Sequence, residues 1–348
     1  MPSSQDCFAS PAVSSSRSWR PTCERRSAHS RATSRGAQLP PASQRRPRRS
    51  CLAVPGSNPR FHAKADQSAA DMIFLDLEDA VAPSAKEEAR ELVVSALNQY
   101  AFESKVRGVR INDVTTRWCG DDVREVVEGA GERLDCLVVP KVEDQDHVHF
   151  VHHLLNQLEA KLGLSRRIGL ELQLETARGL ENASRMAAAS DRTETLIFGP
   201  VDLAADLRLP SLRSGDLRDD YPGDFWHHFH ATVLVAARAH GLQAIDGPYV
   251  QVRDLAGLRR FAARSAALGY DGKWALNPAQ IEVLNEVYAP SPADFRRALE
   301  IVEAYRQATD AESRGAVMLG DEMIDEASRK LAQVMVERGR AAGLEEGT

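Results

Sequence analysis

The chain has 348 residues, of which 43% are hydrophobic and 27% are charged, values that are ordinary for a globular protein with a sizeable core. Its net charge of −6 combines two unlike parts, because residues 1–50 carry ten Arg, no Lys and two acids (about +8), which leaves about −14 for the rest. An acidic body disfavours nucleic acid as a partner, and the apolar runs are too short to span a membrane.

Residues 1–50 are rich in Ser, Arg and Pro and show neither helical nor strand periodicity, so we expect them to be disordered. Two explanations fit this composition. The segment resembles an Arg-rich and Ser-rich transit peptide, which would direct the protein to a mitochondrion or plastid. Alternatively, it is an upstream extension from a misassigned start codon. We favour the second explanation and expect a cytoplasmic protein, with a mitochondrial location as the alternative.

The chain has five cysteines, which is an odd number, and none of them forms a CxxC pair. This pattern favours reduced thiols in a reducing compartment over a disulfide framework.

After residue 50, short apolar runs rich in β-branched residues alternate with longer segments of helical period, such as 85–100 and 146–162. Eight such βα units predict a TIM (β/α)8 barrel. A doubly wound open sheet is the main competitor, but it would need a Gly-rich turn after the first strand, where VPGSNPR has a single Gly. We expect strands at 51–55, 72–77, 106–111, 136–140, 168–174, 195–199, 242–246 and 272–276.

Beyond residue 290 we expect no further strands. The segments 290–308 and 321–342 predict two helices, joined by a loop that contains GAVMLG. The predicted organisation is therefore a disordered extension at 1–50, a barrel at 51–290, and a C-terminal helical lid or oligomerisation segment at 291–348.

Charged and polar residues follow nearly every predicted strand, and in a TIM barrel those strand ends surround the active site. Crowded carboxylates must share protons, pair with cations or hold a metal, and oxygen ligands suit Mg²⁺ or Mn²⁺. The pattern favours a divalent-metal enzyme with an anionic substrate over a purely structural network. The residues expected at this mouth are Arg60, Lys64, Asp76, Glu78, Asp79, Arg110, Asn112, Lys141, Glu143, Glu175, Arg178, Asp202, Asp246 and Asn277.

Seven sequence motifs occur in an order that is typical of one protein family. They are VPGSNPRF, LDLEDAV, VRIN, LVVPKVE, LETARGL, VDLAADL and DGKWALNP. Over residues 51–340 the sequence resembles the citrate lyase beta-subunit-like group of the HpcH/HpaI aldolase superfamily, which includes malyl-CoA and citramalyl-CoA lyases. Each motif alone would be weak, but their combination and order are specific.

The resemblance implies that Glu175 and Asp202 bind Mg²⁺, with Mn²⁺ as an alternative, and that Arg110 contacts the oxo-acid and thioester oxygens. It also implies that Asp325, in a C-terminal lid often donated by the adjacent subunit, serves in acid–base chemistry. Three basic residues are expected to contact coenzyme A: Arg60, Lys64 and Lys86.

We further predict that Glu78 and Asp79 orient Arg110 and the metal-bound waters without binding the metal themselves. Two positions depart from the family pattern. Val201 stands where the family usually has an acid, and Asn277 stands where it usually has His. Neither position is a metal ligand, and both are expected to affect substrate choice or the fit of CoA.

The implied activity is Mg²⁺-dependent cleavage, or formation, of a 3-hydroxyacyl-CoA such as malyl-CoA or citramalyl-CoA. The products would be a 2-oxo acid (glyoxylate or pyruvate) and an acetyl-CoA-type thioester. Two alternatives stay open, namely the beta subunit of a citrate lyase complex that acts on an acyl-carrier thioester, and an aldolase for free 2-oxo acids. The expected assembly is a homotrimer or hexamer.

Overall fold

The computed structural model describes residues 46–210, 221–312 and 315–345. Residues 1–45, which include most of the segment expected to be disordered, lie outside these ranges. Residues 46–49 precede the first strand, and Arg48 among them is buried against Glu171. The three-part division of the chain stays a prediction.

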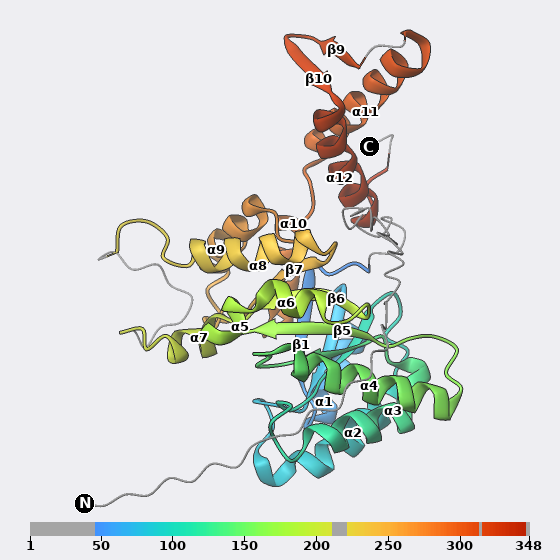
Figure 1. Cartoon of the computed structure of the whole chain (residues 1–348), viewed down its shortest axis with the longest axis vertical. Helices are drawn as coiled ribbons and strands as arrows, with labels where there is room; N and C mark the ends of the chain where they lie inside the picture. Colours follow the sequence, from blue (N-terminus) through green and yellow to red (C-terminus); the bar gives the residue numbers. More distant parts are fainter. Residues whose placement is uncertain (1–45, 211–220, 313–314, 346–348) are drawn as a thin grey trace, which may run out of the picture. The chain divides into compact units, whose positions relative to one another are not determined.

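Eight parallel strands, paired in chain order, form a closed barrel (Figure 1). The circle closes where β8 pairs with β1, with Ser50 opposite Lys273 and Leu52 opposite Ala275. The TIM-barrel prediction is confirmed. The strands are β1 (Ser50–Pro55), β2 (Met72–Asp76), β3 (Val106–Arg110), β4 (Cys136–Val139), β5 (Gly169–Leu174), β6 (Thr193–Phe198), β7 (Gln243–Asp246) and β8 (Gly272–Ala275).

Strand residues alternate between two apolar layers, as the period of two in a strand requires. One small cluster joins side chains from seven of the strands, which only the barrel interior allows; it includes Phe74, Ile245 and Trp274. A larger cluster joins the outward-facing strand residues to the surrounding helices. The direction of each side chain therefore follows from its parity along the strand.

The helices that follow the strands cover the barrel, and α2, α3 and α4 pack side by side (Figure 1). They are α1 (Pro59–Asp66), α2 (Lys86–Gln99), α3 (Cys119–Ala130), α4 (Gln145–Leu162), α5 (Ala177–Glu181), α6 (Ala183–Ala188), α7 (Pro200–Asp206), α8 (His227–Ala239), α9 (Leu255–Leu268) and α10 (Ile281–Val287). Short 3-10 turns are η2 (Pro83–Ala85), η3 (Gly131–Arg133) and η4 (Pro278–Gln280).

Side-chain caps fix where several helices start at the C-terminal mouth of the barrel. Asn58 accepts a hydrogen bond from the backbone N–H of Arg60 at the start of α1. Thr176 accepts one from Gly179 at the start of α5, so the chain turns into a helix directly after Glu175. Such caps satisfy N–H groups that would otherwise lack partners and make the strand-to-helix turns well defined.

The C-terminal segment differs from its prediction. It contains α11 (Pro292–Glu312), a hairpin of β9 (Ala316–Leu319) and β10 (Glu322–Asp325), and α12 (Glu326–Ala341). The expectation of a loop at 315–320, followed by a helix from 321, was therefore wrong. Gly320, at φ +65°, begins a two-residue turn that favours a hairpin, and Val317 and Ile324 alternate with exposed residues.

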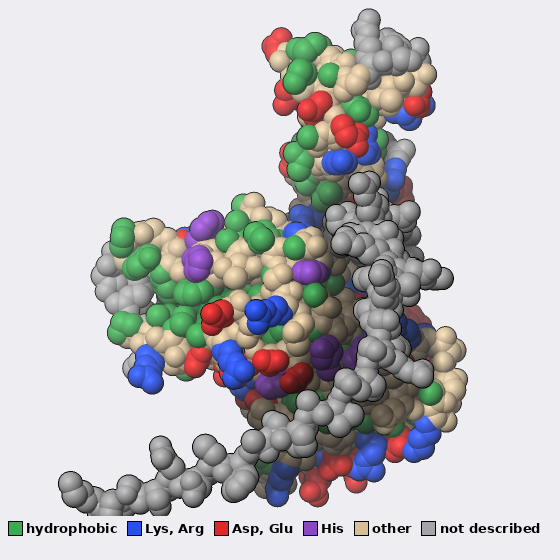
Figure 2. All heavy atoms as spheres, in the orientation of Figure 1, with side chains coloured by type: hydrophobic (Ala, Val, Ile, Leu, Met, Phe, Trp, Pro, Cys, Tyr) green, Lys and Arg blue, Asp and Glu red, His purple; other side chains and the backbone are tan. Residues whose placement is uncertain are grey.

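Among the described residues, no helix is both long and apolar enough to cross a membrane. On the face seen in Figure 2, basic and acidic side chains are interspersed, and no patch of a single sign dominates.

Candidate metal and substrate site

A cavity of about 350 Å³ lies at the C-terminal ends of the barrel strands. Its walls include Asp79, Arg110, Glu175 and Asp202, four of the residues predicted for the site. They come from four different strand–helix connections, so the barrel brings together groups that are far apart in the sequence. Asp76, Gln173 and Trp274 also line this cavity.

Glu175, at the end of β5, is almost completely buried, with 1% of its surface exposed. Its Oε1 accepts a hydrogen bond from the backbone N–H of Lys141 at 2.9 Å, and its Oε2 accepts one from Gln173 Nε2 at 2.5 Å. Burial, followed by the charges of Asp202 and Glu78, holds the pKa of Glu175 well above its ordinary range. The carboxyl is therefore oriented by neutral donors while its negative charge is poorly compensated.

Gly199 makes room for this carboxyl. A Cβ atom at Gly199 would lie 2.4 Å from Glu175 Cβ and 2.8 Å from its Oε2, closer than real side chains come. Three residues further on, Asp202 lies in the first turn of α7 with its side chain 39% exposed. The absence of a side chain at Gly199 thus lets the Glu175 carboxylate lie directly beside the start of α7, whose first turn carries Asp202.

Glu175 and Asp202 fit a magnesium ion. Both present carboxylate oxygens to one cavity, and the buried Oε1 of the neighbouring Gln173 has no hydrogen-bond partner within the described part of the chain. Among the described residues no cluster of three or more His, Cys, Asp or Glu side chains is placed to hold a metal. Two protein carboxylates leave the other positions to water and substrate oxygens, which is the arrangement Mg²⁺ commonly adopts.

Arg110, the last residue of β3, is held by acids on two sides. Asp76 accepts from Nε at 2.7 Å and from Nη2 at 2.6 Å, and Glu78 Oε2 lies 2.9 Å from Nη1. The guanidinium carbon also lies 5.4 Å from the centre of the Trp274 ring. Because a guanidinium has five N–H donors, Arg110 keeps donors for a ligand in the cavity.

Glu78 and Asp79 lie beside Arg110, as predicted, and both contact Lys141. The Lys141 ammonium donates to Glu78 Oε1 and, at 3.3 Å, to Asp79 Oδ1. Burial raises the pKa of Glu78 to about 7, although Arg110 and Lys141 act in the opposite direction. Asp79 is more open, with a side chain 55% exposed.

The three basic residues predicted for coenzyme A have different surroundings. Arg60 and Lys64 are exposed on α1, one helical turn apart and next to the mouth. Lys86 is buried, and its ammonium donates to Leu77 O at 2.9 Å, Glu78 O at 3.0 Å and Asn112 Oδ1 at 2.5 Å. With three internal acceptors for its three N–H groups, Lys86 offers no free donor to a phosphate in this structure.

Asp325 ends β10 and caps α12 by accepting hydrogen bonds from the backbone N–H and the hydroxyl of Ser328. These hydrogen bonds, the backbone one foremost, lower the pKa of Asp325. Within the described part of this chain, its hydrogen bonds join it to the start of α12 and not to the barrel mouth. The structure therefore leaves its predicted acid–base role untested.

The two departures from the family pattern also have clear positions. Val201 lies on the cavity wall next to Asp202, and its side chain is partly exposed. Asn277 caps η4 by accepting from the backbone N–H of Ala279, and Gln280 completes a capping box. Asn277 therefore has a local structural role in addition to any effect on substrate.

Sequence reasoning placed Lys141 at the mouth but gave it no role, and it did not single out Gln173 or Trp274 as site residues. Gln173 and Glu175 are two positions apart, so strand periodicity places their side chains on the same face. For Lys141 and Trp274, the only signal was their position near the ends of strands β4 and β8.

Asp246, which was predicted at the mouth, faces away from the central cavity and does not line it. Its neighbour Ile245 faces the barrel interior, so Asp246 faces the outer helices, where Lys273 Nζ donates to it at 2.7 Å and Ser265 Oγ at 2.8 Å. His230 Nε2 lies 3.1 Å away on the other side. The acid that ends β7 therefore belongs to a separate network.

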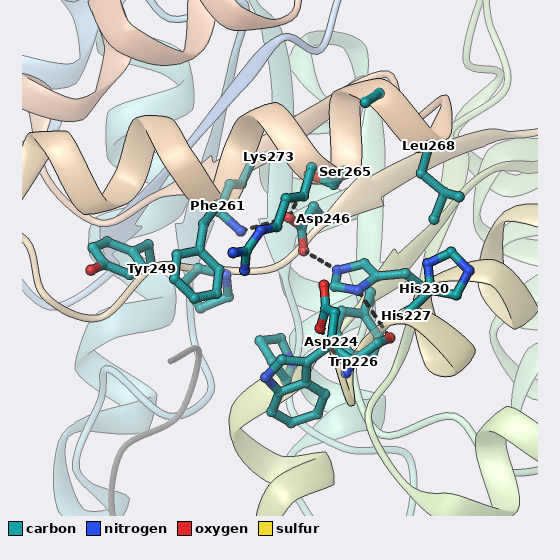
Figure 3. A pocket seen from close by; sticks show the side chains of 15 residues that line it. Asp224, Trp226, His227, His230, Asp246, Tyr249, Phe261, Ser265, Leu268 and Lys273 are labelled. Atoms are coloured by element: carbon teal, nitrogen blue, oxygen red, sulfur yellow. Dashed lines mark hydrogen bonds and ion pairs between the residues drawn. The ribbon is translucent and has the colours of Figure 1, made fainter. Parts of the chain in front are cut away.

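This network borders a second cavity of about 480 Å³, shown in Figure 3, between the barrel and helices α8 and α9. Its walls are largely apolar and include the aromatic side chains of Trp226, Tyr249 and Phe261. Although burial acts to raise it, the pKa of Asp246 is lowered because Lys273 and His230 stabilise the carboxylate. The ionised carboxylate at the edge of this cavity is thus already compensated by the protein.

Comparisons with known proteins show the family of this chain. The profile of the HpcH/HpaI aldolase/citrate lyase family matches residues 49–278. The L-malyl-CoA/beta-methylmalyl-CoA lyase of Rhodobacter capsulatus is 38% identical over 312 residues, covering 87% of this chain and 98% of the relative. The malyl-CoA/beta-methylmalyl-CoA/citramalyl-CoA lyase of Chloroflexus aurantiacus is 32% identical, covering 78% and 81%.

Among solved structures, protein CitE of Mycobacterium tuberculosis, in complex with magnesium, acetoacetate and coenzyme A, is similar to this chain. The TM-score is 0.65 at 29% identity, and the match covers 84% of this chain and 97% of CitE. The family profile, the full-length relatives and the barrel agree, and the chain belongs to the HpcH/HpaI aldolase/citrate lyase family.

Proposed function

We propose that this protein is a Mg²⁺-dependent carbon–carbon lyase that cleaves or forms a 3-hydroxyacyl-CoA such as malyl-CoA or citramalyl-CoA. The products of cleavage are a 2-oxo acid and an acetyl-CoA-type thioester. The observation that carries the proposal is the meeting of Glu175, Asp202 and Arg110 in one cavity. Two carboxylates for a cation and one guanidinium for an anionic substrate are the groups that this chemistry requires.

In this proposal Glu175 and Asp202 hold the cation, and both carboxylates are in position before the substrate binds. The backbone of Lys141 and the amide of Gln173 fix the two oxygens of Glu175, and the helical turn of α7 fixes Asp202. When bound, the divalent ion would supply Lewis-acid polarisation of the hydroxyl and carboxylate oxygens of the substrate. Manganese is an alternative ion for the same oxygen ligands.

Arg110 has the role of stabilising negative charge on the thioester oxygen as the carbon–carbon bond breaks. Asp76 and Glu78 hold the guanidinium in place before the reaction, so little reorganisation is needed when charge develops. In cleavage the proton of the substrate hydroxyl passes to a base, the carbon–oxygen bond becomes the carbonyl of the 2-oxo acid, and the electron pair of the broken carbon–carbon bond forms a thioester enolate. The enolate then takes up a proton at its α-carbon.

Asp325 is our candidate for the group that delivers or removes this α-carbon proton. Because its contacts within the described part of one chain are with Ser328, we propose that an adjacent subunit supplies Asp325 to the mouth. This assignment calls for a homo-oligomer, and a trimer or hexamer is the proposed assembly. A cytoplasmic location stays a prediction.

Coenzyme A would bind along α1, where Arg60 and Lys64 present exposed cations beside the mouth. Lys86 takes a different part in this proposal from the one the sequence suggested. It ties the turn after β2 to Asn112 after β3, and so keeps Glu78 next to Arg110. The two alternative activities, on an acyl-carrier thioester or on free oxo acids, differ from this proposal in their use of Arg60 and Lys64.

The test is to incubate the purified protein with Mg²⁺ and a panel of 3-hydroxyacyl-CoAs and, separately, with free hydroxy-oxo acids, and to measure released glyoxylate or pyruvate. We expect release from the CoA esters, and its loss in Glu175→Gln. Glu181→Gln, at an exposed acid on α5, is the matched control and should stay active. Failure to cleave any CoA ester, or equal activity in Glu175→Gln, would contradict the proposal.

A further inference from the structure

Lys141 has two features that the activity proposed above does not explain, an unusual backbone conformation and a side chain that contacts several acids of the site. It follows β4 and Pro140 with φ +50°, and is one of four non-glycine residues at positive φ in the described part of the chain. For an L-residue this backbone region is costly, by about 1–2 kcal/mol. A strained residue is retained where its surroundings hold it in place, and such residues cluster at functional sites.

The strained backbone has a definite consequence for Glu175. In this conformation the Lys141 N–H points at Glu175 Oε1 and donates to it at 2.9 Å. Glu175 is one of the two carboxylates proposed to hold the metal. The backbone of Lys141 therefore orients one metal ligand.

The side chain of the same residue reaches the other ligand. Its ammonium lies 3.8 Å from Asp202 Oδ1 and also contacts Glu78 and Asp79. The ammonium thus occupies a position among the carboxylates that surround the proposed metal site. It is partly buried, with a side chain 26% exposed, so water screens these charges incompletely.

The charges at this mouth are unequal. Among the described residues, Asp76, Glu78, Asp79 and Asp202 form ion pairs with only two cations, Arg110 and Lys141, and Glu175 forms none. Lys86 acts on Asp76, Glu78 and Asp79 without an ion pair, because its ammonium donates to two backbone carbonyls and Asn112. Arg110 is committed to Asp76 and Glu78. Lys141 is therefore the cation that compensates the side of the cluster nearest Asp202.

We propose that Lys141 is a built-in counter-cation of the metal site, whose ammonium neutralises Asp202 and Glu78 before the metal binds and opposes metal binding by its charge. Its backbone fixes Glu175 in the same conformation. This inference rests on the proposed function, because a metal at Glu175 and Asp202 is part of it. Lys141 acts through these carboxylates and is a positioning residue.

Removing the ammonium has an unusual predicted effect. Loss of a purely structural contact would loosen the site and weaken metal binding. Loss of a competing positive charge leaves the same carboxylates with less compensation, so the metal should bind more tightly. The ammonium lies 3.8 Å from Asp202 Oδ1 and is partly buried. Removing a unit charge so close to the proposed ligand should change the affinity for the metal ion by about tenfold.

The experiment measures Mn²⁺ binding to the metal-free full chain, from the electron paramagnetic resonance signal of free Mn²⁺, without substrate and at low ionic strength. We expect Lys141→Met to lower the Kd by about tenfold. Lys141→Arg, which keeps the charge, should stay within about twofold of the wild type. Circular dichroism checks that each variant is folded.

Lys161→Met is the matched control, because Lys161 lies on α4, 67% exposed, and pairs with Glu128 away from the mouth. It removes the same charge from the chain and should leave the Kd unchanged. Unchanged or weaker binding in folded Lys141→Met would overturn the inference and leave the proposed function standing. A wild type that binds no Mn²⁺ would overturn both.

Discussion

Glu175 and Asp246 are two carboxylates at the ends of barrel strands with nearly equal burial, 1% and 3% exposed. Asp246 accepts from Lys273 and Ser265 and lies beside His230, and its pKa is lowered in spite of its burial. Glu175 accepts only from uncharged N–H groups, and burial and neighbouring acids raise its pKa. The comparison shows that the set of partners, rather than burial itself, decides whether the pKa of a buried carboxyl is lowered, as in Asp246, or raised, as in Glu175.

The largest expected effect is on catalysis by Glu175. Glu175→Gln keeps the shape of the side chain but removes a carboxylate ligand, so kcat/KM for CoA-ester cleavage should fall about a thousandfold. Because the lost charge was poorly compensated, the free energy of unfolding of the metal-free protein should stay equal or rise. Assays of released oxo acid and urea unfolding measure the two quantities. If Glu175→Gln instead lowers the free energy of unfolding by about 3 kcal/mol, Glu175 is a structural carboxylate like Asp246.

Asp246→Asn should show the opposite behaviour. The substitution leaves the Lys273 ammonium, 4% exposed, without a charged partner, so the free energy of unfolding should fall by about 3 kcal/mol. The specific activity of the folded fraction should change little, because Asp246 lies outside the central cavity. Urea unfolding with a constant m-value tests the first statement. An unchanged urea midpoint in Asp246→Asn would contradict the structural role of Asp246.

Gly199→Ala tests the room left for Glu175. The added methyl would come within 2.4 Å of Glu175 Cβ, so the carboxyl must shift from its position. We expect kcat/KM to fall about a hundredfold, because small displacements of a metal-site group are costly. Measuring the rate against Mg²⁺ concentration would show whether the loss lies in metal binding, as expected. Normal metal dependence with a normal rate would indicate that the packing around Glu175 is not needed.

The pH dependence of stability should also separate the two types of acid. Glu78 has a folded-state pKa of about 7, raised from 4.5, so between these values the folded protein binds more protons than the unfolded chain. The free energy of unfolding of the metal-free protein should therefore fall, by about 1–2 kcal/mol, as pH rises from about 4.5 to 7. Asp246, with a lowered pKa, contributes stability above about pH 4 that is lost as the pH falls further.

Urea unfolding at pH 5 and pH 7 measures the slope in this window, and Glu78→Gln should flatten it. A wild-type slope of the opposite sign would show that the mouth acids are compensated as well as Asp246 is.

The smallest expected effect concerns the backbone that orients Glu175. At φ +50°, Gly avoids the steric cost that Ala would meet, so Lys141→Gly should be more stable than Lys141→Ala by about 1 kcal/mol. Comparing the thermal unfolding of Lys141→Gly and Lys141→Ala isolates the effect of the backbone conformation on stability, because both variants lack the ammonium. Equal stability would mean that the conformation carries no strain.

The fold was predictable because apolar runs and helical segments alternate eight times, and each strand was found within a few residues of its bounds. The hairpin at β9 and β10 was missed because a short, half-exposed pair of strands has a weak apolar pattern. Its turn at Gly320 was the available signal.

The site was partly predictable from the ends of strands. Glu78 lies beside Arg110, as expected. Asp246 was predicted at the mouth because only its position at a strand end was considered. The prediction ignored the face of the strand: Ile245 faces the barrel interior, so the adjacent Asp246 faces outward. The burial of Lys86 could not be foreseen, because its acceptors, two backbone carbonyls and Asn112, come together only in the folded barrel.

The most direct test of the central claim is Mn²⁺ binding by Glu175→Gln and Asp246→Asn, measured side by side with the wild type under conditions where all three are folded. We expect Glu175→Gln to lose Mn²⁺ binding and Asp246→Asn to keep the wild-type Kd. Retained binding in Glu175→Gln together with loss in Asp246→Asn would contradict the central claim, because the metal would then belong to the network between the barrel and its helices.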